Sequence, residues 1–100
     1  MIYRMRTYRS TPDRIASSHE VFYEHVHPVH VKHGARFIGR WQTEDDRIVV
    51  IWEYDSVEEC ERIQKAVHDD PALVATDTKR KSSGLLGADR EEILMTPTGG

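Results

Sequence analysis

The chain has 100 residues, 31% of them charged, and a formal net charge of −3. This length suffices for one domain, to which we assign residues 1–98, with residues 99–100 as a tail. The sequence has no long basic stripe and no long apolar run, so we expect neither a nucleic-acid partner nor a membrane span. Its one cysteine excludes an internal disulfide, and we expect a cytoplasmic, reduced setting.

The first third of the chain predicts a strand and then a long helix. Residues 2–9 alternate between polar and apolar side chains, which is typical of a strand. Thr11-Pro12 starts the helix, with a hydroxyl at the N-cap and proline at the first helical position. We expect Pro28 to bend or break this helix and Gly34 to end it. Its apolar stripe contains Ile15, Phe22, Val26 and Val29.

The middle of the chain predicts a β-hairpin that holds both tryptophans. Two runs rich in aromatic and β-branched residues, 37–44 and 48–56, flank the polar turn 45–47. Because side chains alternate along a strand, Trp41 and Thr43 share one face of the first run. Trp52 and Tyr54 likewise share one face of the second run.

The last part of the chain predicts two helical pieces and a final strand. A capping box at residues 56–59 starts a helix. The apolar stripe of this helix is Val57, Cys60, Ile63 or Ala66, and Val67. Asp70-Pro71 restarts a helix toward residue 82, residues 83–87 mark its exit, and residues 91–96 form the last strand.

The order β-α-β-β-α-β predicts an α+β, ferredoxin-like fold, with a four-stranded antiparallel sheet and helices on one face. The hairpin is too apolar for the other face of the sheet to be wet. The apolar residues that carry this argument are Trp41, Val50, Ile51, Trp52 and Tyr54. A second copy of the sheet is the simplest cover, so we predict a two-fold homodimer.

Five short motifs resemble the NIPSNAP family, in order along nearly the whole chain. They are Arg6-Thr7-Tyr8, Pro28…His33-Gly34, Ile38-Gly39-x-Trp41-x-Thr43-Glu44, Ile51-Trp52-x-Tyr54-x-Ser56 and Asp70-Pro71. The resemblance implies a dimeric α+β barrel, in which two sheets face each other around a cavity. That superfamily includes cofactor-free monooxygenases, lactone isomerases and haem enzymes, and many bacterial members have no settled reaction.

Histidines crowd the end of the first predicted helix. They are His25, His27, His30 and His33, with His19 a few turns earlier. Two imidazoles at helical spacing and a carboxylate could hold Zn²⁺, or one imidazole could ligate haem. The set contains no closed ligand pattern, and cationic histidines also favour a helix C-terminus. We therefore predict no metal and no other cofactor.

Three residues are candidates for catalysis. His33 stands where the resemblance places a histidine before Gly34, and it acts either as a general acid or base or as a cap of the last helical carbonyls. Arg6 and Tyr8 share a face of the first strand, which is central in this fold. Since a charge there needs a partner, Arg6 either pairs with Glu53 or a glutamate of the last strand, or lines a cavity and clamps a carboxylate or enolate.

Two functions are compatible with these residues. In the first, a cavity between the two sheets, or between sheet and helices, binds a small, partly aromatic or anionic metabolite. Its ligand-binding residues are Arg6, Tyr8, Trp41, Thr43, Trp52 and Tyr54, and its catalytic residues are His33, Arg6 and Tyr8. The resemblance suggests cofactor-free oxygenation or isomerisation as the reaction. In the second, the protein is a non-enzymatic dimeric interaction or ligand-sensing module whose aromatic residues are fully packed.

Overall fold

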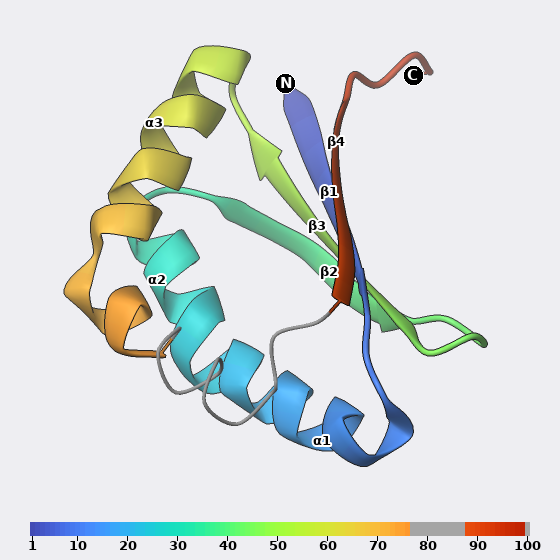
Figure 1. Ribbon diagram of the computed structural model, residues 1–100. Coiled ribbons are helices and arrows are strands. Elements are labelled where there is room, and N and C mark those ends of the chain that lie inside the picture. The colour runs from blue at the N-terminus through green and yellow to red at the C-terminus, as the bar shows by residue number, and fades with distance from the viewer. Residues whose placement is uncertain (77–87, 100) are drawn as a thin grey trace.

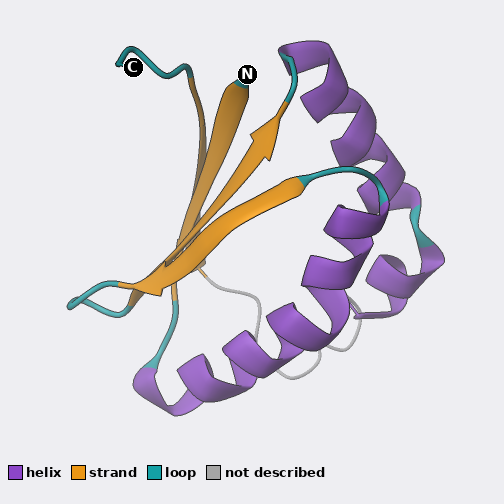
Figure 2. Cartoon of the chain, turned by 180° about the vertical axis from the view of Figure 1, so that it is seen from behind, coloured by secondary structure: helices purple, strands orange, loops and turns teal. Residues whose placement is uncertain are grey.

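Four antiparallel strands and a set of helices on one side of them make up the fold, as the computed structural model of the protein shows for residues 1–76 and 88–99 (Figure 1). The strands are β1 (Ile2–Arg9), β2 (Arg36–Gln42), β3 (Arg47–Tyr54) and β4 (Ala88–Met95). The helical segments are α1 (Pro12–Val21), η1 (Phe22–Val26), α2 (His27–Lys32) and α3 (Val57–Asp69). The strand order β2-β3-β1-β4, with α1, α2 and α3 on one side (Figure 2), confirms the α+β, ferredoxin-like prediction.

The first helix continues through Pro28 because one of its turns is wider than an α-turn. In the π-helical segment η1, the backbone N–H of His27 donates to the carbonyl of Phe22, five residues earlier. Of the two expected effects of Pro28, a bend or a break, the break is absent: the helix geometry changes just before the proline, and the helix continues to Lys32. Gly34 follows with a φ of +108°, a conformation that favours glycine, and confirms the predicted stop.

The helix caps explain where the other helical segments begin. The Ser56 hydroxyl accepts from the Glu59 backbone N–H at 3.1 Å and starts α3, as predicted. Thr11 occupies the N-cap of α1, but its side chain makes no capping bond. Asp70 caps residues 71–76, which are helical, through the N–H of Ala72 at 3.0 Å. The rest of the predicted second piece, and its predicted exit at residues 83–87, lie outside the described residues.

Alternation along the strands gives the sheet two different faces. Ile48, Val50, Trp52 and Tyr54 of β3 are buried against the helices. We call this side the helix-side face and the other side the open face. None of the described helices is long and apolar enough to cross a bilayer.

A β-bulge in β2 decides which face Trp41 occupies. The register of β2 on β3 shifts between Phe37 and Gly39, so Phe37 lies opposite Trp52, whereas Arg40 lies opposite Val50. Without the bulge, Phe37 and Trp41 would share a face; with it, Arg40 takes the helix-side face and Trp41 the open face. A Cβ at Gly39 would approach the Trp41 indole to 2.4 Å, so only glycine leaves room for this ring.

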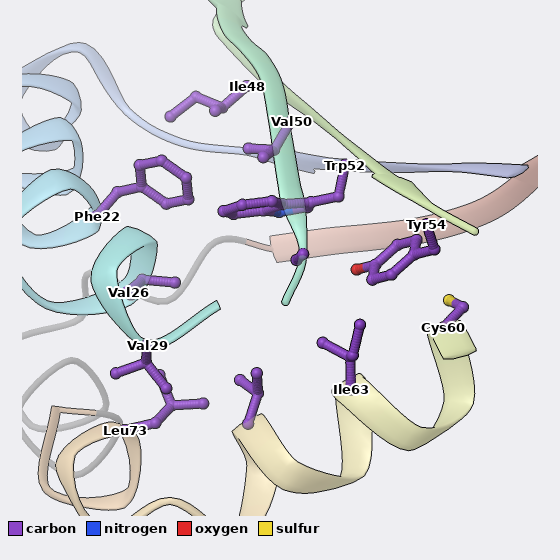
Figure 3. Close-up of a cluster of buried hydrophobic side chains, with 12 residues drawn as sticks. Phe22, Val26, Val29, Ile48, Val50, Trp52, Tyr54, Cys60, Ile63 and Leu73 are labelled. Atoms are coloured by element: carbon purple, nitrogen blue, oxygen red, sulfur yellow. The ribbon is translucent and has the colours of Figure 1, made fainter. Parts of the chain in front are cut away.

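The hydrophobic core lies between the helices and the helix-side face. In Figure 3, Phe22 and Val26 of the first helix and Ile63 of α3 face the side chains of β3. Trp52 lies at the centre of an aromatic cluster, with the ring of Phe37 at 5.1 Å. The predicted stripes are confirmed for Ile15, Phe22, Val26, Val29, Cys60, Ile63 and Val67, which are all buried. The prediction for Val57 is wrong: this first residue of α3 is 46% exposed.

Candidate functional site

A polar row crosses the helix-side face of the sheet. Arg6 of β1 pairs with Val50 on one side and with Glu92 of β4 on the other, and Arg40 of β2 pairs with the far side of Val50. The row therefore reads Arg40, Val50, Arg6, Glu92 across four strands. Because neighbouring strands lie about 4.8 Å apart, the Cα atoms of Arg40 and Arg6 are separated by about 10 Å.

The guanidinium of Arg40 joins this row to the first helix. Its Nε donates to Nδ1 of His19 at 2.9 Å. Its Nη2 donates to Oη of Tyr8 at 2.7 Å and to Oγ of Ser18 at 3.1 Å. Its Cζ also lies 4.3 Å from the centre of the Phe22 ring, within the range of a cation–π contact. Polar groups thus connect α1 to the helix-side face of the sheet. In a simple two-layer domain, apolar side chains would pack between the helix and the sheet.

His19 is a neutral partner in this cluster. Its partial burial, and then the charge of Arg40, lower the pKa of His19, and a hydrogen bond to Gln42 only partly opposes them. The imidazole is therefore uncharged at neutral pH, with Nδ1 free of a proton and able to accept from Arg40. His19 is positioned as an acceptor that orients the guanidinium.

Arg6 has no such partners. Burial, and then the charges of Arg90 and Arg4, lower the pKa of Arg6, and Glu92 only partly offsets them. Within the described part of the chain, its side chain makes no hydrogen bond or ion pair. The predicted ion pair of Arg6 with Glu53 or a glutamate of the last strand is therefore not formed.

The two glutamates bind other arginines. Glu53 lies on the open face and hydrogen-bonds Arg36. Glu92 forms its ion pair with Arg4, whose Nε also donates to Oη of Tyr54 at 3.1 Å. Arg4 is 3% exposed, so it is the arginine of β1 that follows the expected rule of a buried charge with a partner.

The structure divides the predicted ligand-binding residues among four places. Arg6 and Tyr8 lie together on the helix-side face, beside the Arg40 cluster. Trp52 and Tyr54 share that face but are 2% and 0% exposed, within the core. Trp41 lies on the open face, whereas the Thr43 hydroxyl accepts from the backbone N–H of Arg47 in the hairpin turn.

His33 lies at the end of α2, where Asp70 holds it. Its Nε2 lies 2.9 Å from Oδ2 of Asp70, and Nζ of Lys32 lies 3.1 Å from the same oxygen. These contacts attach the end of α2 to the residue that follows α3. His33 therefore does not meet Arg6 and Tyr8 in one group.

The other predicted histidines also point to different surroundings. His25 is exposed, the ring of His27 lies 4.7 Å from that of Phe37, and His30 stacks on Trp52 at 4.6 Å. Across residues 1–76 and 88–99, no three His, Cys, Asp or Glu side chains form a group that could hold a metal ion. The absence of a metal or other cofactor from the working protein stays a prediction.

We expect Asp70 to make the protein sensitive to acid. The bond to His33, then the Ala72 N–H and Lys32, lower the pKa of Asp70 from 3.8 to about 2. A carboxyl whose pKa is lower in the folded chain stabilises the fold above its unfolded pKa, and this stabilisation disappears as the pH falls through the folded value. The free energy of unfolding should therefore fall between about pH 4 and pH 2.

Urea unfolding measured across this pH range tests the role of Asp70. The Asp70→Asn variant should be less stable than the wild type at neutral pH and should lose less stability on acidification. Asp69→Asn is the matched control, because Asp69 is the exposed neighbour. If the two variants respond to acid alike, Asp70 is not the group responsible.

Comparison with known proteins identifies relatives of this fold. The sequence profile of the NIPSNAP family matches residues 3–99. Protein Atu4242 from Agrobacterium tumefaciens has 23% identity and a TM-score of 0.86, over 98% of this chain and 94% of that chain. An uncharacterized NIPSNAP domain protein from Burkholderia xenovorans has 20% identity and a TM-score of 0.85, over 98% and 95%.

One protein of similar fold but lower identity is described as an enzyme. A monooxygenase from ActVA-Orf6 of Streptomyces coelicolor, solved in complex with nanaomycin D, has 15% identity and a TM-score of 0.68, over 99% of this chain and 88% of that chain. No functionally curated protein matches the chain in sequence. At these identities, the similarity to solved structures shows the fold.

The site also contains two residues, Arg40 and Ser18, that the sequence analysis missed. Ile15, Ser18 and Phe22 follow a helical spacing, so Ser18 could have been placed beside the apolar stripe, close to which His19 was expected. The face of Arg40 depends on the bulge in β2, for which Gly39 is the only local signal.

Proposed function

Because the chain belongs to the NIPSNAP family, we propose that it forms a homodimer that binds a small organic molecule between its first helix and the helix-side face of the sheet. The observation that carries this proposal is the polar cluster of Arg40, Tyr8, Ser18 and His19 in that layer. Ser18 is buried and the other three residues are half-buried, and polar groups in such places cost stability relative to apolar packing. A binding site gives a reason for their presence.

The cluster combines the two kinds of group that ligand sites use, apolar surface and a few placed polar atoms. Phe22 supplies an aromatic ring beside the guanidinium of Arg40. The Tyr8 hydroxyl accepts from Arg40, which leaves its own proton for a ligand. In the enzymatic form of the proposal, the reaction is a cofactor-free oxygenation or isomerisation. A protein of similar fold is described as a monooxygenase, which supports the oxygenation.

The burial of Trp52 and Tyr54 favours a second candidate, a non-enzymatic dimeric interaction or ligand-sensing module. Both rings were expected to form pocket walls, and both are packed in the core. We keep a cytoplasmic location as an expectation for either candidate. Ligand titration separates binding from mere packing.

The binding test follows amide resonances of isotope-labelled protein during titration with planar aromatic compounds. Cinnamate and cinnamyl alcohol are a matched pair, one anionic and one neutral. We expect shifts concentrated at Tyr8, Ser18 and His19, with little change at Ile93 on the open face. Shifts spread evenly over the surface, or none with either compound, would contradict a site in this layer.

The homodimer is proposed to form through the open face of the sheet. The face carries a band of apolar side chains, namely Met5, Trp41, Val49, Ile51, Ile93 and Met95. Trp41 and Ile93 are each 48% exposed in the single chain, and charged pairs such as Arg36 with Glu53 lie toward the edge. An apolar centre with a charged margin is the pattern of a sheet that packs on a second sheet.

Light scattering at micromolar concentration should give twice the mass of one chain. Ile51→Glu should give a monomer, because Ile51 lies between Met5 and Gly39 in the middle of the face and a carboxylate there would be buried in the dimer. Val31→Glu is the control, since Val31 is 46% exposed on α2, on the other side of the sheet. A monomeric wild type would refute the dimer.

A further inference from the structure

We propose that the ligand of this site is an organic carboxylate, whose anionic group is held between the guanidiniums of Arg6 and Arg40, beside Val50. This inference rests on the proposed function and names its ligand class. It depends on a juxtaposition: two arginines lie in one row of the sheet, on either side of a small side chain, and neither forms an ion pair among the described residues. Glu92 lies opposite Arg6, but its carboxylate pairs with Arg4.

The charges on the helix-side face do not balance. Arg4 has Glu92, its counterion. The three acceptors of Arg40 are an imidazole nitrogen and two hydroxyl oxygens, which fix the guanidinium without neutralising it. Arg90, on β4, adds a further positive charge close enough to lower the pKa of Arg6. An anion would bring the missing negative charge to this face.

Arg6 is the strongest sign of a missing anion. A guanidinium has five N–H donors, and even partial burial without protein acceptors, as at Arg6, costs free energy. Its lowered pKa has this cause, because burial is the largest contribution and neighbouring cations come next. A carboxylate beside Arg6 would reverse both effects, since it supplies negative charge and accepts two charge-assisted hydrogen bonds.

Arg40 is prepared for the same role by its rigid position. Its Nε and both N–H groups of Nη2 are used by His19, Tyr8 and Ser18. The two N–H groups of Nη1 have no acceptor within the described residues and are available to a ligand. Since three bonds and the Phe22 ring already fix the guanidinium, little side-chain entropy is lost when an anion binds.

Two apolar side chains lie beside the two cations, and the spacing of the strands sets the distance between them. Val50 lies between them in the sheet, and Phe22 lies against Arg40 from the helix side. Cα atoms about 10 Å apart allow two arginine side chains to reach one carboxylate from opposite sides. Val50 is 3% exposed and Phe22 is 6% exposed, so both are already packed in the core, and the carboxylate is the part of the ligand that these residues specify.

The test compares cinnamate with cinnamyl alcohol by calorimetric titration of the full chain. At low salt, the wild-type protein should bind cinnamate at least about tenfold more tightly than cinnamyl alcohol. This ratio corresponds to a difference of about 1.4 kcal/mol in binding free energy. Arg6→Gln and Arg40→Gln should each remove this preference, because each should weaken the binding of cinnamate more than the binding of the alcohol. Arg36→Gln is the matched control, because Arg36 lies on the open face, and it should keep the preference.

The outcomes separate this inference from the proposed function. Equal affinity for the two compounds would overturn the anion site while leaving a site for neutral molecules. A preference for cinnamate that survives both substitutions would also overturn it, because other cations would then hold the anion. If either variant does not fold, the titration is repeated with the wild type at rising chloride concentration. The affinity for cinnamate should then fall several-fold, whereas the affinity for the alcohol should not change. Binding of neither compound would overturn the proposed function and this inference together.

Discussion

Trp52→Ala is expected to lower the free energy of unfolding by about 3–5 kcal/mol. The indole is 2% exposed and touches both layers of the domain. The Phe37 ring lies at 5.1 Å and the Phe22 ring at 6.2 Å, and His30 stacks on it at 4.6 Å. Rings held by two different layers cannot collapse into the space, so a cavity remains. The total free energy of unfolding of a small domain is about 5–15 kcal/mol, so this loss is a large share of it.

Urea unfolding monitored by circular dichroism measures the effect. Trp41→Ala is the matched control, with the same change in the same hairpin but on the half-exposed open face. Both variants should be made in the Ile51→Glu background, so that dissociation of the proposed dimer does not enter the comparison. There, Trp41→Ala should change the free energy of unfolding by less than about 0.5 kcal/mol. Equal losses for the two tryptophans would contradict their assignment to opposite faces.

Arg4→Met is expected to lower the free energy of unfolding by about 1–3 kcal/mol. Methionine keeps much of the arginine stem, so the loss comes from the Tyr54 hydroxyl, which is buried and loses its donor. Glu92 loses its ion-pair partner too, but its side chain is 49% exposed and can turn to water. The cost should therefore stay below the roughly 3–5 kcal/mol of breaking a fully buried ion pair.

A double-mutant cycle with Tyr54→Phe tests this assignment. If the stranded hydroxyl is the main cause, Arg4→Met should cost clearly less in the Tyr54→Phe background than in the wild type. Equal costs in the two backgrounds would show that the hydroxyl is not involved. The Arg36→Gln variant again serves as a control, because its partner Glu53 lies on the open face.

Local patterns in the sequence were sufficient for the helices, strands and topology. The Ser56 cap, the Gly34 stop and the buried stripe of the first helix depend on residues a few positions apart, and each was predicted correctly. Side-chain alternation also placed Arg6 and Tyr8 on one face of β1. These features follow from backbone geometry, which operates over short distances along the chain.

The candidate site depends on contacts that no local pattern determines. Glu92 lies opposite Arg6 in the register of β1 on β4, yet its carboxylate pairs with Arg4, two residues away along β1. Whether Trp41 or Arg40 faces the helices is decided by one bulge, which reverses the alternation that sequence analysis assumes. The sequence analysis therefore missed site residues whose position depends on how the strands pair, and not on their spacing along the sequence.

The wide turn in the first helix has a consequence for the comparison of sequences. Compared with an ordinary α-helix, the segment Phe22–Val26 holds one extra residue. A single residue advances the helix by about 100°, so every side chain after Val26 is rotated by that amount. A relative with a regular helix here must be aligned with a one-residue gap near this turn. Without that gap, His30, which stacks on Trp52, would be matched to a neighbour that faces a different direction.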